Sequence, residues 1–133
     1  MKNAPLKFNV VDSCGWLEYF ADGPNASFFE EALLHTPTLI VPALCLYEVG
    51  RRLLTTRGEA AALEALEMMR KARVVHLTED QLFLAAKASA TYSLSMGDAM
   101  IWQTAQTHSA NLLTQDAGMK ALPNVQFKAT VKK

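Results

Sequence analysis

Short runs of β-branched and aliphatic residues alternate along this chain with longer segments of helical periodicity. The runs expected to form strands cover 7–12, 38–42, 74–78, 111–116 and 125–130. Helices are predicted for 13–20, 25–35, 43–56, 59–72, 79–93 and 97–110. Parallel neighbouring strands need a crossover between them, and that crossover is usually a helix. The alternation therefore predicts an α/β fold, a three-layer α/β/α sandwich with a mostly parallel central sheet.

The composition agrees with a single domain that spans residues 1–133. Half of the 133 residues are apolar, and the six glycines and five prolines fall singly between the periodic segments. The two cysteines, Cys14 and Cys45, match no metal-binding or disulfide pattern, so we expect two ordinary buried thiols in the reduced state. No apolar run is long enough to serve as a signal peptide or to cross a membrane, so we expect a cytoplasmic protein without a membrane partner.

Acidic residues stand at the ends of predicted strands. Asp12 follows the first strand in "VVDSCGWLEYF", and Asp116 ends the fourth in "NLLTQD". Glu48 lies early in the helix that follows the second strand, and Asp98 opens the helix "GDAMIWQTA". Because parallel strands end at one edge of the sheet, where such folds bind their ligands, we expect these four carboxylates to lie close together.

Each acid, taken alone, also has a purely structural explanation. The alternatives are a helix cap at Asp12, an ion pair of Glu48 with Arg51 or Arg52, a capping box of Ser95 with Asp98, and an Asx turn at Asp116. Four carboxylates gathered at one edge, however, must raise some of their pKa values or bind cations. Oxygen ligands without thiolate or imidazole suit Mg²⁺ or Mn²⁺. Such a site supports phosphodiester hydrolysis by a metal-activated water.

Four segments resemble, in order and spacing, the motifs of the PIN-domain family, particularly the VapC toxins of VapBC toxin–antitoxin pairs. They are "VVDSCGWLEYF", "LIVPALCLYEVGRRL", "SLSMGDAMIWQTAQTHSANLLTQD" and "LPNVQF". The resemblance implies an α/β/α sandwich, a Mg²⁺- or Mn²⁺-dependent endoribonuclease and a homodimer. It also implies an RNA substrate and a small VapB-like antitoxin whose C-terminal segment occupies the acidic groove.

The resemblance also assigns roles to individual residues. The acidic quartet of the family corresponds to Asp12, Glu48, Asp98 and Asp116. These residues are expected to be catalytic and to bind the metal. Glu48 would act either as a further ligand or as the group that orients the attacking water. The hydroxyls beside the acids correspond to Ser13 and Thr114, which are expected to hold the carboxylates in position. Some relatives carry a further acid near the third position, where this chain has "SMG", so the number of metal ions stays open.

The remaining features are less specific. Arg51 and Arg52 are candidates for RNA contact, with ion pairing to nearby acids as the alternative. The net charge is zero, so any attraction to RNA must be local. The last six residues, "KATVKK", are expected to form a frayed basic end.

The principal alternative function is a non-catalytic PIN-like module that docks a basic peptide or RNA. Retention of all four acids favours the nuclease. Phosphatases of the haloacid dehalogenase type need D-x-D after the first strand, but Cys14 stands two residues after Asp12. Receiver domains need an aspartate at the end of the third strand, where this chain has Thr78, and no nucleotide-binding glycine motif occurs.

Overall fold

The computed structural model describes residues 7–131. The strands are β1 (Phe8–Val11), β2 (Leu39–Pro42), β3 (Arg73–Val75), β4 (Ala110–Thr114) and β5 (Val125–Phe127). The helices are α1 (Ser13–Phe20), α2 (Ala26–Leu34), α3 (Ala43–Thr56), α4 (Glu59–Met69), α5 (Glu79–Tyr92) and α6 (Met96–Thr107). Short 3₁₀ helices cover Thr36–Thr38 and Ala117–Met119. Each α-helix agrees with its prediction to within three residues at either end.

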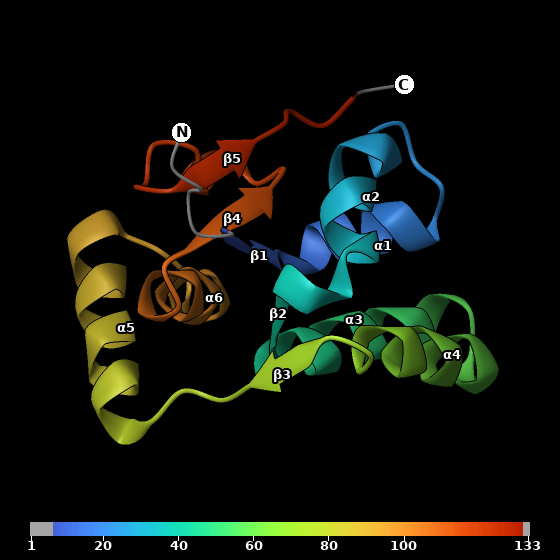
Figure 1. The fold of residues 1–133 in the computed structure, drawn as a ribbon, viewed down its shortest axis with the longest axis horizontal. Helices are drawn as coiled ribbons and strands as arrows, with labels where there is room; N and C mark the ends of the chain where they lie inside the picture. The colour runs from blue at the N-terminus through green and yellow to red at the C-terminus, as the bar shows by residue number, and fades with distance from the viewer. Residues whose placement is uncertain (1–6, 132–133) are drawn as a thin grey trace, which may run out of the picture.

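The five strands form one sheet in the order β3-β2-β1-β4-β5, and every neighbouring pair is parallel. Helices α1 to α4 cover one face, and α5 and α6 cover the other (Figure 1). This confirms the predicted three-layer sandwich. The chain first winds from β1 through β2 to β3, and then returns to place β4 on the other side of β1. The direction of winding therefore reverses between β1 and β4, which is where open α/β sheets bind ligands.

Both edge strands are shorter than predicted, because their partners end first. The sequence pattern continues three residues beyond each of them. Val75, the last residue of β3, pairs with Pro42, which ends β2 and also occupies the N-cap position of α3. Phe127, the last residue of β5, pairs with Thr114, which ends β4. A residue beyond either position has no strand opposite it, so apolar pattern alone cannot set the length of an edge strand.

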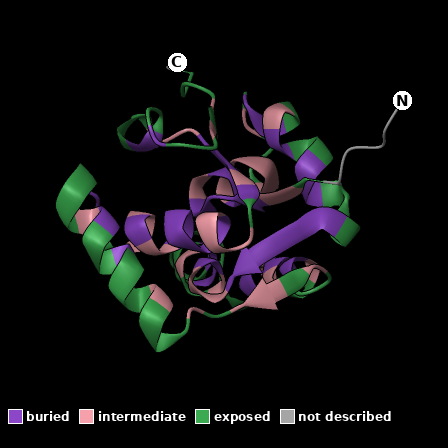
Figure 2. Ribbon diagram, turned by 60° about the vertical axis from the view of Figure 1, so that its left-hand side comes forward, coloured by how far each residue is buried: buried purple, intermediate pink, exposed green. Residues whose placement is uncertain are grey.

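The centre of the sheet is buried on both faces (Figure 2). Val10, Val11, Ile40 and Val41 are each at most 1% exposed. Continuous aliphatic runs of this kind are typical of parallel strands covered by helices on both sides. A Cβ atom at Gly15 would lie only 2.6 Å from a methyl carbon of Val11, so glycine allows α1 to pack directly on β1. This close packing fixes the β1–α1 junction, where Asp12 lies.

The chain end is more ordered than a frayed tail. The Lys128 amide donates to the Thr114 carbonyl at 3.0 Å, and the Ala129 carbonyl accepts from the Asn25 side chain at 2.9 Å. The expectation of fraying is thus wrong for Lys128 and Ala129, while 132–133 lie outside the described part.

No helix between residues 7 and 131 combines the length and the apolar character needed to cross a membrane. The assignment of residues 1–133 to one domain stays a prediction, since 1–6 and 132–133 are not described.

Candidate metal centre

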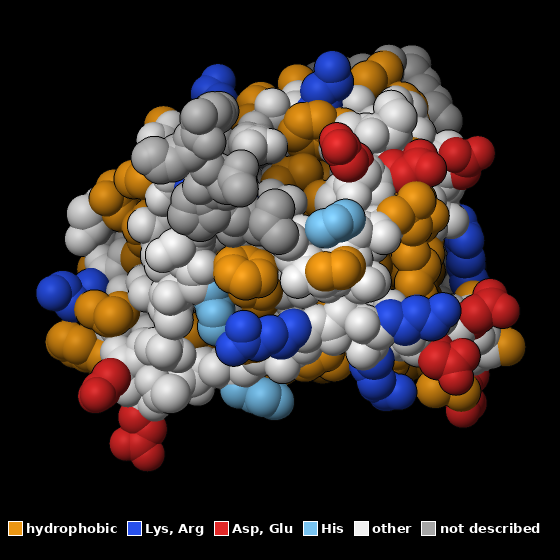
Figure 3. Space-filling model, viewed as in Figure 1, with side chains coloured by type: hydrophobic (Ala, Val, Ile, Leu, Met, Phe, Trp, Pro, Cys, Tyr) orange, Lys and Arg blue, Asp and Glu red, His pale blue; other side chains and the backbone are white. Residues whose placement is uncertain are grey.

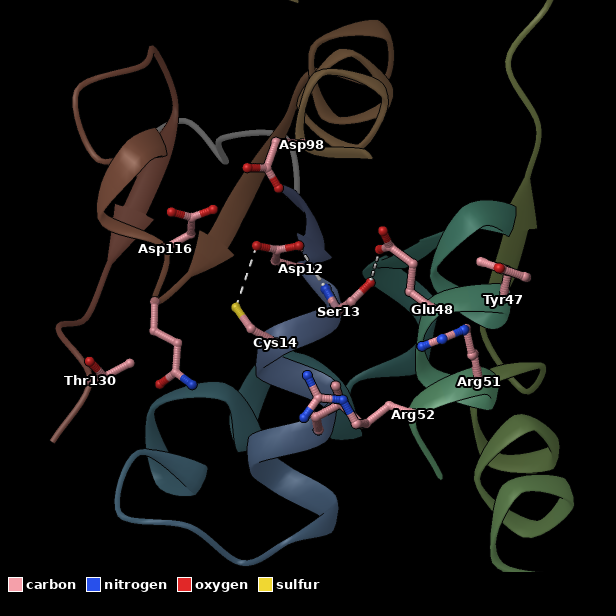
Figure 4. Close-up of a pocket in the computed structure, with 12 residues that line it drawn as sticks. Asp12, Ser13, Cys14, Tyr47, Glu48, Arg51, Arg52, Asp98, Asp116 and Thr130 are labelled. Atoms are coloured by element: carbon pink, nitrogen blue, oxygen red, sulfur yellow. Dashed lines mark hydrogen bonds between the residues drawn. The ribbon is translucent and has the colours of Figure 1, made fainter. Parts of the chain in front are cut away.

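All four predicted acids line one cleft at the carboxyl edge of the sheet (Figure 4). Asp12 follows β1 and Asp116 follows β4, the two strands that flank the switch point. Asp98 lies in the first turn of α6, and Glu48 in the second turn of α3. Asp12, Asp98 and Asp116 each offer a carboxylate oxygen within 4.8 Å of the other two. The fourth acid, Glu48, lines the same cleft but stands outside this close group.

Asp12 is the buried member of the group, with 5% of its surface exposed. One carboxylate oxygen accepts from the Ser13 amide at 2.8 Å and so caps α1. The other accepts from the Thr114 hydroxyl at 2.7 Å and from the Cys14 thiol at 3.4 Å. Burial raises the pKa of Asp12 above its usual value. The three hydrogen bonds act in the opposite direction and lower this pKa, whereas the nearby Glu48 charge raises it further.

Asp98 faces the other two aspartates. Burial, the hydrogen bond with the Asp116 carboxyl, and the charges of Asp116 and Asp12 together raise the pKa of Asp98 to about 7. The Ser95 hydroxyl accepts from the Asp98 amide at 3.2 Å and caps α6, which is the Ser95 half of the capping box that the sequence suggests. The cap uses the backbone of Asp98 and leaves its carboxyl group available to the cleft.

Thr114 connects two of the acids. Its hydroxyl donates to Asp12 and accepts from the Asp116 amide at 2.9 Å. Asp116 also forms the expected Asx turn, because its carboxylate accepts from the Gly118 amide at 2.9 Å. These bonds fix the direction of the Asp116 side chain toward the cleft.

Glu48 is held by Ser13, whose hydroxyl donates to a Glu48 carboxylate oxygen at 2.5 Å. Figure 4 marks the hydrogen bonds between the residues drawn and shows none between Glu48 and Arg51 or Arg52. Both arginines nevertheless line the cleft. A Cβ atom at Gly97, next to Asp98, would lie 2.7 Å from Glu48 Oε2, so the absence of a side chain there leaves room for this carboxylate.

Sequence reasoning missed several residues of the cleft. Cys14 was expected to be an ordinary buried thiol, yet it is partly exposed and bonded to Asp12. Burial and the Asp12 charge raise the pKa of Cys14 to about 12, so its thiol stays protonated and donates. The other cleft residues not predicted are Leu17, Tyr47, Gln115 and Thr130. The position of Cys14, two residues after the first acid, was the available sequence signal that it lies in the cleft. The presence of the other four residues in the cleft depends on tertiary packing.

The donor set suits a hard divalent cation. Three carboxylates converge, and the adjacent thiol is protonated, so oxygen is the ligand on offer. Burial, and then the neighbouring Asp116 and Asp12, raise the pKa of Asp98, and acids this close resist ionising together unless a positive charge joins them. Asp12, Asp98 and Asp116 are therefore the residues that would hold a metal ion.

Several solved structures have the same fold. A toxin–antitoxin complex from Klebsiella pneumoniae matches with a TM-score of 0.77 and 19% identity over 92% of this chain and 99% of that chain. DNA-bound VapBC from Salmonella typhimurium matches with a TM-score of 0.70 and 13% identity over 93% and 98%. VapC20 of Mycobacterium tuberculosis, described as a toxin that cleaves the sarcin-ricin loop, matches with a TM-score of 0.68 and 17% identity over 84% and 91%.

No curated protein sequence matches this chain. The model of the family described as "PIN domain" matches residues 10–125, which include all four cleft acids and most of the chain. The protein therefore belongs to the PIN-domain family.

Proposed function

We propose that this protein is a metal-dependent endoribonuclease and the toxin of a toxin–antitoxin pair. The observation that carries the proposal is the convergence of Asp12, Asp98 and Asp116 within 4.8 Å, at the switch point of a PIN fold. The toxins among the similar structures support the second part. We place the protein in the cytoplasm, where RNA is available.

Mg²⁺ or Mn²⁺ bound by the three aspartates would supply positive charge for the scissile phosphate and lower the pKa of the attacking water. Ser13 fixes Glu48 at the side of the cleft, where its free oxygen can orient that water or add a ligand. Thr114 holds Asp12 and the Asp116 backbone in fixed positions. Attack by water on phosphorus breaks the bond to the 3′ oxygen and leaves a 5′-phosphate and a 3′-hydroxyl.

Arg51 and Arg52 are suited to bind the RNA backbone. They follow Glu48 on α3 and line the cleft beside the acids. The net charge is zero, and on the face shown in Figure 3 basic and acidic side chains are interspersed. A few local arginines must therefore supply the attraction at the cleft. Arg57, the C-cap residue of the same helix, lines a different pocket and donates to the Phe20 carbonyl at 3.3 Å. It is the matched control for both.

The deciding experiment is cleavage of total RNA by purified protein freed of any partner. We expect discrete cuts with 5′-phosphate ends in Mg²⁺ or Mn²⁺, none in EDTA, and none for Asp98→Asn. Asp80→Asn, an exposed acid in the first turn of α5, should cut like the wild type. Cyclic 2′,3′-phosphate ends would refute the water mechanism. A folded, metal-binding protein that cuts no RNA would favour a non-catalytic module that docks a basic peptide or RNA.

RNA binding is tested separately in the Asp98→Asn background, where cleavage is blocked. Arg51→Ala and Arg52→Ala should each weaken binding and lower the salt slope of log Kd by roughly one, as expected for one lost phosphate contact. Arg57→Ala should change neither. Equal effects of all three substitutions would show general electrostatics instead of contacts in the cleft.

We also propose a homodimer and a small VapB-like antitoxin as partners. Exposed apolar side chains gather on α5 and at the start of α6, where Phe83 is 66% and Met96 74% exposed. Figure 3 shows apolar side chains over α5 at the left edge of the molecule. Light scattering of the purified protein tests the dimer, and Phe83→Lys should shift it to monomer. Co-purification with the product of an adjacent small reading frame tests the antitoxin.

A further inference from the structure

Asn25 is a buried amide in the loop between α1 and α2. Only 3% of its surface is exposed, and it occupies the N-cap position of α2 without capping that helix. Its side-chain nitrogen donates instead to Gln115 Oε1 at 2.9 Å and to the Ala129 carbonyl at 2.9 Å. Both amide hydrogens are thus used, which fixes the orientation of the side chain. The partners lie 90 and 104 residues further along the chain.

Glu18 on α1 binds both the backbone of Asn25 and the side chain of Gln115. One Glu18 carboxylate oxygen accepts from the Asn25 backbone amide at 2.6 Å, and the other accepts from Gln115 Nε2 at 3.5 Å. The loop can close around Glu18 because Gly23 has no side chain. A Cβ atom at this position would lie 2.5 Å from the Glu18 carboxyl group. Asn25 therefore joins α1, the end of β4 and the C-terminal segment.

The joined parts form one side of the acid cleft. Gln115 precedes Asp116, and both line the cleft together with Thr130, which follows Ala129. Figure 4 shows Thr130 on one side of the aspartates, with Tyr47 and Arg51 on the other. Thr130 is exposed, and the backbone pairing of its segment ends at Lys128. The bond from Asn25 to the Ala129 carbonyl is made by the residue directly before Thr130.

We infer that Asn25 is a positioning residue that holds residues 128–131 as a wall of the cleft, and that the substrate strand binds against this wall. The inference rests on the proposed nuclease function for the identity of the substrate. Thr130 offers a hydroxyl and backbone groups to the phosphate or ribose of RNA, opposite the arginines of α3. Without the Asn25 amide, the Ala129 carbonyl loses its donor and the segment leaves the cleft. The acids keep their own hydrogen bonds, none of which involves Asn25.

Asn25→Ala tests this in the full chain. We expect KM for a short single-stranded RNA to rise about fivefold to tenfold, the usual effect of losing a hydrogen-bonded contact, while kcat changes less than about twofold. Hydrogen exchange should accelerate in residues 128–131 and stay unchanged in β1 and β4. The matched control is Asn111→Ala, which removes an amide of β4 from a different pocket.

Thr130→Ala, at an exposed position, should raise KM in the same way. Because both changes act through one wall, the double variant should bind RNA no worse than the poorer single variant. Additive effects, a fall in kcat at constant KM, or faster exchange throughout the protein would overturn the inference. If Asn25→Ala does not fold, Thr130→Ala alone decides, and an unchanged KM refutes the wall.

The two proposals fail in different ways. A wild-type protein that cleaves no RNA refutes the nuclease, but exchange in residues 128–131 of Asn25→Ala still shows whether the bond to Ala129 holds the segment. RNA affinity of the same variant, measured by fluorescence anisotropy, then replaces KM. A wild-type protein that cleaves RNA with an unchanged KM in both variants refutes the wall and leaves the nuclease intact.

Discussion

Replacing Asp98 by asparagine should stabilise the metal-free protein at alkaline pH, although it removes a proposed metal ligand. Burial and the neighbouring Asp116 and Asp12 raise the pKa of Asp98 from 3.8 to about 7. The folded state therefore holds this proton more tightly than the unfolded state does. Stability contributed by the protonated group is present below about pH 4 and is lost as pH rises toward 7. Above that pH, Asp98 is ionised in the folded protein, and the free energy of unfolding is lowered by the full unfavourable effect of its burial beside Asp116 and Asp12.

The size of the effect follows from the shift. Three units correspond to about 4 kcal/mol at 1.36 kcal/mol per unit, which is an upper limit. The Asp98 side chain is only half-buried, and solvent screening reduces the effect, so we expect Asp98→Asn to gain about 1–2 kcal/mol. For a domain of this size, that gain raises Tm by about 5 °C.

Thermal unfolding in EDTA checks this prediction at two pH values. At about pH 8 the variant should melt above the wild type, and at about pH 3 the two should nearly coincide, because Asp98 is then mostly protonated in both states. Adding Mn²⁺ should raise the Tm of the wild type far more than that of the variant. Asp80→Asn supplies the control, because it makes the same substitution at an exposed acid outside the cleft. A variant that is less stable at pH 8, or equally shifted at both pH values, would refute the reasoning.

Two further predictions concern single side chains of the cleft. Gly97→Ala places a methyl group against the Glu48 carboxylate and should slow RNA cleavage by about tenfold or more, as for other groups that orient ligands. The control is Gly50→Ala on α3, where the new Cβ atom would lie 3.7 Å from its nearest neighbour. This variant should keep full activity, and its free energy of unfolding in urea should rise by up to about 1 kcal/mol. Equal losses of activity would contradict this. Cys14, whose pKa is raised to about 12 by burial, should resist iodoacetamide until the protein unfolds, and mass spectrometry of the native protein would reveal any early labelling.

The meeting of the four acids in one cleft is predictable from the sequence. Alternation of strands and helices requires a parallel sheet, and a parallel sheet ends its strands at one edge. The separation of Glu48 from the three aspartates is not predictable in this way. It depends on a hydroxyl from Ser13, at 35 residues' distance in sequence, and on the space left by Gly97. Both are consequences of how α1, α3 and α6 pack.

The local and the functional interpretations of the acids turn out to be compatible. Asp12 caps α1 with one oxygen, and its other oxygen faces Thr114 and the cleft. Ser95 caps α6 through the Asp98 backbone, and Asp116 closes an Asx turn. A carboxylate has two oxygens and several lone pairs, so a structural bond to one of them orients the rest. Local motifs alone therefore cannot distinguish a capping acid from a metal ligand.

Burial is what separates the two roles. A capping acid on the surface remains solvated, whereas Asp12 is 5% exposed and still lies beside two other carboxylates. Three hydrogen bonds lower the pKa of Asp12, yet burial and the Glu48 charge outweigh them and the pKa stays raised. Uncharged donors thus do not compensate for the burial of this carboxylate, to which the Glu48 charge adds. A bound divalent cation would compensate for this cost, which supports the proposal that the three aspartates form a metal centre and are not only independent caps.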